Sequence, residues 1–260
     1  MLGAHGRRRA GMGDEFWQYR PAHAGDDARA IDWRRSARSD AHFVREKEWQ
    51  AAQTVALWVD PGRSMAFSGD PGRPTKADRA RLLALALTVL LIRGGERVGL
   101  ADGRVRPRPG LSQADRLAEA LAADTPDAPD YAAPATTLLP PHGRAVFLSD
   151  FLGDPAGIEA AVLRAAGQGT RGVLLQILDP QEEAFPFDGR TIFESMSGAL
   201  RHETLRAGDL RTRYLQRLAE RKALLNDLAR AAGWQVFCHH TDSPAASALL
   251  WLYQALERRR

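Results

Sequence analysis

The sequence predicts an α/β fold in which a mainly parallel sheet carries helices on both faces and follows an N-terminal extension. From residue 53 onward, short apolar runs typical of buried strands alternate with longer segments of helical periodicity. This alternation implies parallel strands that are joined by crossover helices. Three of the apolar runs end directly in an aspartate, at the position where open α/β sheets place their ligand sites.

The first fifth of the chain differs in composition from the rest. Residues 1–13 are rich in glycine and arginine, whereas residues 14–20 include three aromatic side chains and are expected to pack on the main body. A turn rich in glycine and aspartate precedes a short helix, expected over residues 32–37 with an aspartate as N-cap. Residues 43–49 alternate in character as strands do. The predicted division is an N-terminal signature segment, residues 1–50, and a main domain, residues 51–260.

The main domain alternates strands with helices along its whole length. The expected strands are residues 53–60, 144–150, 172–178 and 234–239. The expected helices are residues 76–93, 112–123, 154–167, 209–232 and 244–257. Asp102 and Gly103, between residues 97–101 and 104–108, are typical of a hairpin turn. Scattered aromatic residues within 181–208 predict a small hairpin or cover.

Composition and charge exclude several classes of protein. A content of 44% hydrophobic and 26% charged residues is typical of a globular chain. The formal net charge of +4 is small, and the basic residues are interleaved with acids, so we expect no nucleic-acid binding. The longest apolar run, residues 82–92, is too short to span a bilayer. Cys238 is the single cysteine and we recognise no signal peptide, so we expect a cytoplasmic protein without a membrane span.

Three aspartates directly follow apolar strands and are expected to gather at one edge of the sheet. They are Asp60, Asp150 and Asp179. With the hydroxyl group of Ser64 and that of Thr136 or Thr137, their carboxylates would form an all-oxygen site suited to Mg²⁺. The alternative is that each aspartate caps the helix or turn that follows it.

Residues 25–48 carry a dense alternation of acids and arginines around Trp33. An indole excludes water and arginine can stack on its face, so we interpret this segment as a buried or docked ion-pair cluster. It either clamps the N-terminal segment onto the sheet or shapes a docking surface near the loop that carries Asp60 and Ser64. The residues of the cluster are Gly25, Asp26, Asp27, Arg29, Asp32, Trp33 and Arg38. The predicted pairs join Asp26, Asp27 and Asp32 to Arg29, Arg34, Arg35 and Arg38.

Several of these motifs carry a resemblance to a known family. They are the run Gly25-Asp26-Asp27-x-Arg29-x-Ile31-Asp32-Trp33, the pairs Ala37-Arg38 and Arg45-Glu46, the loop from Asp60 to Met65, Ser149-Asp150, and Thr241-Asp242. Over nearly its whole length the chain resembles the bacterial family called domain of unknown function 58. That family looks like a variant of the von Willebrand factor A domain, which implies a Rossmann-like sheet. It also implies a metal-ion-dependent adhesion site, where a divalent ion captures an acidic residue of a partner.

The resemblance carries over to this chain residue by residue. Asp60 and Ser64 match the first and third positions of the metal loop, whereas Gly62 replaces the middle serine and removes one hydroxyl ligand. Thr137 matches the distant threonine, and Asp150 matches the later acid. Because Mg²⁺ usually retains several waters, water can replace the missing hydroxyl.

The function implied by the resemblance is protein–protein interaction, without enzymatic activity. Members of the family are commonly encoded beside MoxR-type AAA+ ATPases, which implies an adaptor or co-chaperone for such an ATPase. No serine lies in a G-x-S-x-G elbow, and the chain has no P-loop motif. Two alternatives stay open: a metal-dependent phosphoester hydrolase that uses the same strand-end acids, and a purely structural domain.

Overall fold

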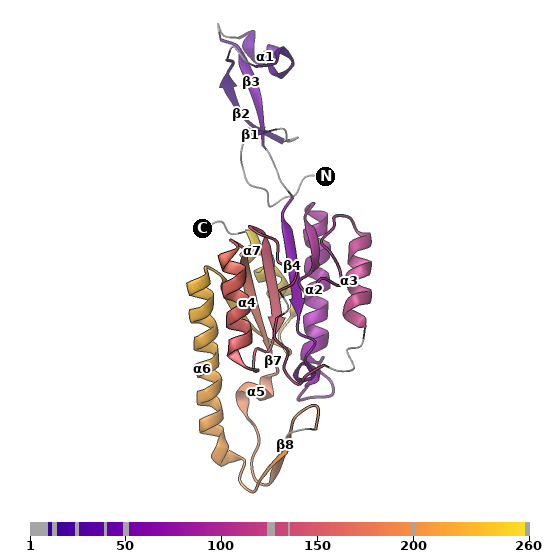
Figure 1. The fold of residues 1–260 in the computed structure, drawn as a ribbon, viewed down its shortest axis with the longest axis vertical. Helices are drawn as coiled ribbons and strands as arrows, with labels where there is room; N and C mark the ends of the chain where they lie inside the picture. The colour runs from indigo at the N-terminus through magenta and orange to yellow at the C-terminus, as the bar shows by residue number, and fades with distance from the viewer. Residues whose placement is uncertain are drawn as a thin grey trace. The chain divides into compact units, whose positions relative to one another are not determined.

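Two compact units make up the chain (Figure 1). The computed structural model describes residues 10–11, 15–23, 26–38, 41–48, 52–123, 128–134, 136–198 and 201–257. The N-terminal unit comprises Met1–Gln53 together with Gly94–Glu96. The sheet unit comprises Thr54–Arg93 and Arg97–Arg260.

The N-terminal unit is built on a small antiparallel sheet. Its strands are β1 (Ala10–Gly11), β2 (Glu15–Pro21) and β3 (Phe43–Glu48), in the order β1-β3-β2. Between β2 and β3 the chain forms the 3-10 helix η1 (Ala28–Ala30) and the short helix α1 (Trp33–Ser36). The aromatic segment that we expected to pack on the main body is therefore strand β2, paired with β3 inside this unit.

Five parallel strands form the central sheet of the sheet unit, in the order β10-β7-β6-β4-β5. They are β4 (Thr54–Val59), β5 (Arg97–Leu100), β6 (Arg144–Ser149), β7 (Arg171–Leu178) and β10 (Gln235–His240). All five are parallel because a helix crosses over between strands, as the alternating sequence pattern predicts. The predicted α/β fold with a mainly parallel sheet is confirmed.

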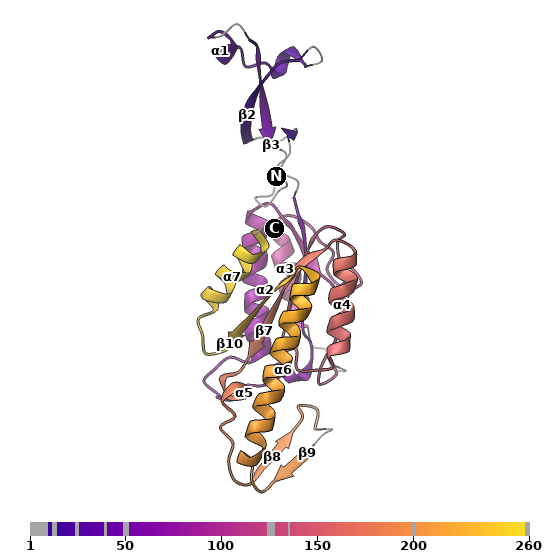
Figure 2. The ribbon, with the colours of Figure 1, turned by 90° about the vertical axis from the view of Figure 1, so that its left-hand side faces the viewer.

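Helices cover both faces of the sheet (Figures 1 and 2). One face carries α2 (Lys76–Arg93), α3 (Ser112–Ala122) and α7 (Ala245–Glu257), and the other carries α4 (Pro155–Gly167) and α6 (Gly208–Ala232). Successive strand residues point to opposite faces. Leu57 accordingly packs in the core with Leu87 of α2, whereas its neighbour Trp58 packs in the other core with Leu225 of α6. Burial on both faces explains why the strands read as continuous apolar runs.

The predicted small hairpin lies between β7 and α6 (Figure 2). It consists of helix α5 (Pro180–Ala184) and the antiparallel strands β8 (Thr191–Glu194) and β9 (Arg201–Thr204). The hairpin expected after β5 is reduced to a single bridge between Val98 and Arg108. Pro107 has no N–H to donate, so a regular second strand cannot form there.

No helix in the described part of the chain is long and apolar enough to cross a membrane.

Candidate functional site

Two of the strand-end acids lie together at the carboxyl edge of the sheet. Strands β4 and β6 are neighbours, and Val59 pairs with Leu148. Directly after these strands come Asp60 and Asp150, whose side chains are both buried. The N–H of Asp60 also donates to the carbonyl of Leu148, at 3.0 Å. The parallel register therefore gathers both carboxylates at one place, as the sequence predicts.

The carboxylate of Asp60 is held by two donors of the protein itself. The N–H of Gly62 donates to Asp60 Oδ1 at 2.7 Å, and Ser149 Oγ donates to Asp60 Oδ2 at 2.5 Å. Burial nevertheless raises the pKa of Asp60 to about 6, and the nearby Asp150 adds to this rise, while the two hydrogen bonds oppose it. The site thus holds one carboxylate whose negative charge is only weakly compensated.

The second carboxylate, that of Asp150, is paired with a lysine. Lys76, the first residue of α2, places its Nζ 2.8 Å from Asp150 Oδ2 and 2.6 Å from Glu182 Oε1 of α5. The Lys76 side chain is only 1% exposed. Burial acts to lower the pKa of Lys76, but the two carboxylates outweigh it and the pKa lies above its usual value. A buried ammonium group therefore bridges two acids at the sheet edge.

The loop after β4 is closed tightly against another segment. The 3-10 helix η2 (Arg63–Ala66) begins here, and the N–H groups of Arg63 and Ser64 donate to the carbonyls of Pro129 and Asp130 at 2.9 and 2.8 Å. A Cβ atom on Gly62 would lie 2.8 Å from Asp60 Oδ1 and 3.0 Å from the carbonyl oxygen of Asp130. The serine that the family pattern has at this position would not fit without a shift of the backbone.

Of the other expected ligands, Ser64 lies in this loop and Thr137 does not. The side chain of Ser64 is buried, and its Oγ has no hydrogen-bond partner among the described residues. Thr137 is exposed in a turn, where the next N–H, that of Leu138, donates to the carbonyl of Ala101. Thr136 instead accepts a hydrogen bond from Arg164 of α4. Within the described ranges, neither threonine hydrogen-bonds to the acids of the site.

The residues at this edge do not fit a divalent ion held in the way that the resemblance implies. Asp150 is already ion-paired with Lys76, so a second cation at this carboxylate would meet like-charge repulsion. The middle hydroxyl is missing, and packing around Gly62 excludes it. The threonine expected as the distant ligand lies elsewhere. The Asp60 carboxylate and the Ser64 hydroxyl are then the ligands left at this edge for an ion that prefers about six oxygen ligands.

Asp179, the third strand-end acid, has a structural role. Its carboxylate accepts hydrogen bonds from the N–H groups of Gln181 and Gly69, at 2.9 and 3.2 Å, and from Thr241 Oγ1 at 3.2 Å. The Glu182 side chain accepts in turn from the N–H of Asp179, which completes a capping box on α5. All three aspartates thus accept from the N–H two residues ahead, as the capping alternative predicts, since Asp60 accepts from Gly62 and Asp150 from Leu152. Asp60 and Asp150 also belong to the charged cluster.

Three residues of this cluster are absent from the sequence-based prediction: Lys76, Ser149 and Glu182. One signal was available for the lysine, because the chain has only three lysines among its 36 basic residues. A compact ammonium group suits a tight buried site better than a guanidinium does. The pattern Asp179-x-x-Glu182 is also that of a capping box. Neither signal shows that α2 and α5 meet at the end of β6.

An apolar groove of about 460 Å³ opens beside α5. Phe185 forms its floor, with ring centroids of Phe187, Phe193 and Tyr214 at 5.3, 5.7 and 4.9 Å. Phe185 is not a glycine, yet it has a left-handed backbone with φ of 42°. This conformation is strained for a residue with a side chain. The packing of its ring among the other aromatic residues fixes it there.

The rim of this groove is polar and basic. Arg213 and Arg217, both exposed, lie one turn apart on α6 and line the groove together with His202 of β9. Glu182, which binds Lys76, is also part of its wall. The groove is therefore continuous with the charged cluster at the sheet edge.

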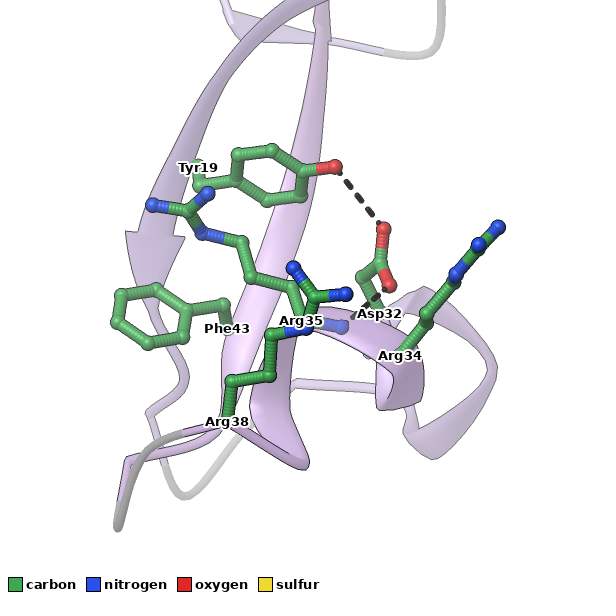
Figure 3. A pocket seen from close by; sticks show the side chains of 6 residues that line it. All are labelled: Tyr19, Asp32, Arg34, Arg35, Arg38 and Phe43. Carbon is green, nitrogen blue, oxygen red and sulfur yellow. Dashed lines mark hydrogen bonds between the residues drawn. The ribbon is translucent and has the colours of Figure 1, made fainter.

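In the N-terminal unit, the acids of the signature cluster stabilise local structure. Asp32 caps α1 by accepting from the N–H of Arg35 at 3.1 Å, and it also accepts from the hydroxyl of Tyr19 at 3.0 Å (Figure 3). The guanidinium group of Arg35 lies 4.4 Å from the centre of the Tyr19 ring. Asp32 and Arg35 therefore tie helix α1 to strand β2, on which Tyr19 lies.

The other acids of the cluster have partners different from the predicted arginines. Asp26 pairs with Arg20 through two contacts of 2.7 and 2.5 Å, and this arginine holds the pKa of Asp26 well below its usual range. Asp27 accepts from the N–H of Arg29 at 3.0 Å rather than from its side chain. Gly25 lies outside the described residues. The predicted pairs are thus wrong, because the donors that the described contacts give these carboxylates are backbone N–H groups, the Tyr19 hydroxyl and the Arg20 side chain.

Trp33 is not buried, although burial was one of the two arrangements expected for this cluster; docking of the cluster stays a prediction. Trp33 is 58% exposed, and its ring meets the ring of His42 edge-on at 5.5 Å. The arginines beside it line an open cavity of about 500 Å³ (Figure 3). Among the residues that the structure describes, Arg34 and Arg38 have no ion-pair partner. The exposed part of the signature therefore includes an indole and two guanidinium groups without an ion-pair partner.

A group of possible metal ligands from a different part of the sheet unit consists of Glu183, Cys238 and His240. Their ligand atoms lie within 4.8 Å of one another, and His240 Nε2 is 2.9 Å from Glu183 Oε2. The ammonium group of Lys222, however, also pairs with Glu183. Burial raises the pKa of the Cys238 thiol, which disfavours the thiolate that binds metals. We therefore interpret Glu183 as the ion-pair partner of Lys222 rather than as a metal ligand.

Comparisons with known proteins show relatives whose function is likewise open. Uncharacterized proteins of Mycobacterium bovis and Mycobacterium tuberculosis are each 28% identical to this chain over 246 residues, which is 89% of this chain and 76% of theirs. Among solved structures, an aerotolerance-related membrane protein from Bacteroides fragilis matches with a TM-score of 0.51 and 16% identity. The match covers 80% of this chain and all of that one. At this identity the likeness shows the fold alone.

Membership of a family is shown by a match to a family model. The model of the family described as protein of unknown function DUF58 matches residues 18–224. This range begins within β2 and includes the signature cluster as well as the sheet strands from β4 to β7. It therefore spans both units of the structure. The chain belongs to the family described as protein of unknown function DUF58.

Proposed function

We propose that this protein is a protein–protein interaction module, which acts as an adaptor or co-chaperone for a MoxR-type AAA+ ATPase. The observation that supports this proposal is the aromatic groove, lined by Phe185, Phe187, Phe193 and Tyr214. Hollowed apolar surfaces with a polar rim are typical of sites that bind partner proteins. Aromatic and arginine side chains are also those that contribute most to binding energy at such sites.

We further propose that the sheet unit is a von Willebrand A-like domain that acts in the cytoplasm without catalysis. Its parallel sheet, with Asp60 and Asp150 at the carboxyl edge, supports this assignment. The groove lies beside the same edge, which is where open α/β sheets bind ligands. Partner capture would then depend on the groove rather than on a bound ion. No contact in the cluster specifically favours the alternative of a phosphoester hydrolase.

The groove proposal is tested with a purified MoxR-type ATPase encoded in the same genome. The dissociation constant is measured by biolayer interferometry for the wild type and for Phe193→Ala and Tyr214→Ala. Removing an aromatic contact at a hot spot costs about 2 kcal/mol or more, so we expect binding at least ~10-fold weaker. Leu163→Ala is the control, because Leu163 is also an exposed apolar residue but lies on α4.

Melting temperatures of all variants show whether weaker binding reflects lost folding. An affinity that stays unchanged in both groove variants, or that falls equally in Leu163→Ala, would contradict the groove as the docking surface. Absence of any binding by the wild type would contradict the partnership with the ATPase itself.

The exposed arginines of the signature cluster support a second contact surface of the same module. Arg34 and Arg38 are free to pair with acidic residues of a partner, since they have no ion-pair partner among the described residues. We expect the double variant Arg34→Glu, Arg38→Glu to bind the ATPase more weakly and with a smaller dependence on salt. Arg29→Glu is the matched control, as Arg29 is also exposed but does not line the cavity. Equal affinity of the double variant and the control would exclude this surface.

A further inference from the structure

We propose that Lys76 supplies the positive charge at the carboxyl edge of the sheet, in the place where the resemblance implies a divalent cation. The ammonium group would thus serve as a cation built into the chain. The edge would then keep its structure without a bound metal ion. The contacts, the burial and the packing of this cluster each support the inference.

The first support is the position of the ammonium group between two carboxylates from different elements. Lys76 Nζ donates to Asp150 Oδ2 at 2.8 Å and to Glu182 Oε1 at 2.6 Å. Asp150 directly follows β6, whereas Glu182 belongs to α5 after β7. A divalent ion at such an edge would bridge carboxylates from separate strands in the same manner. The lysine therefore makes the cross-link that the ion would make.

The second support is burial. The side chain of Lys76 is 1% exposed and that of Asp150 is 1% exposed. A buried charge that loses its partner is strongly destabilising, so the lysine and its acids depend on each other. A partner protein cannot reach the ammonium group without opening the cluster. Lys76 is therefore a structural cation rather than a surface residue that captures acids.

The third support is the packing around the rest of the loop. Gly62 N–H and Ser149 Oγ already donate to the two oxygens of Asp60. The backbone of residues 130–132 occupies the space in which a side chain at position 62 would lie. The ring of Phe67 lies 5.7 Å from Lys76 Nζ and closes the cluster on another side. The side of the loop at position 62 is thus filled by the chain itself.

The consequence concerns the groove as well as the sheet edge. Glu182, one of the two acids bound by Lys76, also lines the aromatic groove, and so does Phe67. Lys76 is therefore a positioning residue, which fixes one wall of the groove relative to the end of β6. Loss of the lysine is expected to loosen this wall even where the sheet remains folded.

The test compares divalent-ion binding by the wild type and by Lys76→Met, which keeps the length of the stem and removes the charge. Titration calorimetry with millimolar MgCl₂ or MnCl₂ is expected to give no saturable heat for the wild type. Its melting temperature is expected to be the same in Mg²⁺ and in EDTA. Lys76→Met leaves Asp150 and Glu182 without a counterion, so its melting temperature should fall and should rise again when Mg²⁺ is added.

Controls separate this explanation from a general loss of packing. In the double variant Lys76→Met, Glu182→Gln one of the two acids is removed, so the Mg²⁺-dependent rise in melting temperature should shrink or vanish. Saturable binding of Mg²⁺ or Mn²⁺ by the wild type that Asp60→Ala abolishes would overturn the inference. Unaltered stability of Lys76→Met would overturn it as well. If Lys76→Met does not fold, the titration of the wild type decides by itself.

Discussion

At the scale of single residues, the charges of the sheet edge are decided by which donors reach which carboxylate. Asp150 receives a full counter-charge from Lys76, whereas Asp60 receives only hydrogen bonds from Gly62 and Ser149. Burial, together with the charge of Asp150, raises the pKa of Asp60 to about 6 against these two hydrogen bonds. Two neighbouring acids with the same sequence context, an apolar strand followed by aspartate, thus end in different electrostatic environments.

A first prediction concerns the space around Gly62. Gly62→Ser would restore the serine of the family pattern, but its Cβ would lie 2.8 Å from Asp60 Oδ1 and 3.0 Å from the Asp130 carbonyl. We expect a loss of roughly 1–3 kcal/mol in the free energy of unfolding, as for other overpacked positions. Urea denaturation measures the change. Gly167→Ser is the control, because a Cβ there meets no atom within 4 Å; equal stability of the two variants would show that the loop has room.

A second prediction concerns His239, which is buried beside Arg79. Arg79 donates from Nη1 to His239 Nε2 at 3.0 Å. Because a guanidinium group can only donate, Nε2 carries no proton and the imidazole is neutral. Burial and then Arg79 lower the pKa of His239 from 6.5 to about 4. Between these two pH values the unfolded chain binds a proton that the folded chain does not, so stability rises with pH and the full contribution is present above pH 6.5.

His239→Gln keeps an acceptor for Arg79 and removes this titration. We expect the wild type to lose roughly 1–3 kcal/mol relative to the variant as the pH falls through this window. Chemical denaturation of both proteins at a series of pH values measures the difference. Parallel stability curves for the two proteins would show that His239 binds its proton equally well in both states.

At the scale of elements, helix α5 joins the sheet edge to the groove. It is only five residues long, and a helix of this length is not stable by itself. Asp179 caps its first turn, and Glu182 closes the capping box while also binding Lys76. Phe185 ends it in a left-handed conformation and points its ring into the groove. Its tertiary contacts therefore hold α5 in place.

A third prediction compares two helix caps. Asp154 caps α4 at the surface by accepting from the N–H of Ala156, whereas Asp179 caps α5 and also binds Gly69 and Thr241. Asp154→Ala should cost about 1 kcal/mol of stability, which is typical of an N-cap. Asp179→Ala should cost roughly 2–4 kcal/mol, because it leaves several buried donors without an acceptor. Guanidinium denaturation measures both; equal losses would mean that Asp179 acts only as a cap.

At the scale of the whole molecule, the two units differ in how much apolar surface they bury. In the described part of the N-terminal unit, Val44 is the only buried hydrophobic residue, whereas the sheet unit has two cores on opposite faces of its sheet. Ion pairs, caps and ring contacts such as that of Arg35 with Tyr19 hold the smaller unit together. Exposed ion pairs contribute little to stability. The two units should therefore differ in local stability.

A fourth prediction follows for hydrogen exchange. Amides of β2 and β3 should exchange before those of β4, β6 and β7, because protection rises with the number of buried apolar contacts around a hydrogen bond. Exchange measured by mass spectrometry on the full chain resolves these segments. Asp26→Asn should accelerate exchange in the N-terminal unit alone, since Asp26 pairs with Arg20 within that unit. Equal protection of β3 and β6 would contradict this difference.

Much of the fold could be predicted because its signals are local in the chain. Apolar runs such as residues 54–59 are long enough to be read as buried strands, and the pair Gly94-Gly95 follows the last residue of helix α2. The second strand after β5 could not be predicted reliably. Pro107 has no N–H to donate to a neighbouring strand, but this matters only where a neighbouring strand needs that hydrogen bond. Pairing depends on neighbours in space, which the order of residues does not state.

The candidate site likewise consists of residues that the sequence predicts and residues that only the fold brings together. Asp60 and Asp150 each follow a strand directly, which places them at the carboxyl edge of a parallel sheet. The sequence by itself therefore determined their positions. Lys76 and Glu182 are distant in the chain from Asp150, and Trp33 lies on a helix face that turns to solvent. Only the tertiary structure could decide these contacts. The physical reason is that secondary structure and sheet edges follow from local periodicity, whereas the partner of a charge is set by whichever groups the folded chain brings within hydrogen-bonding distance.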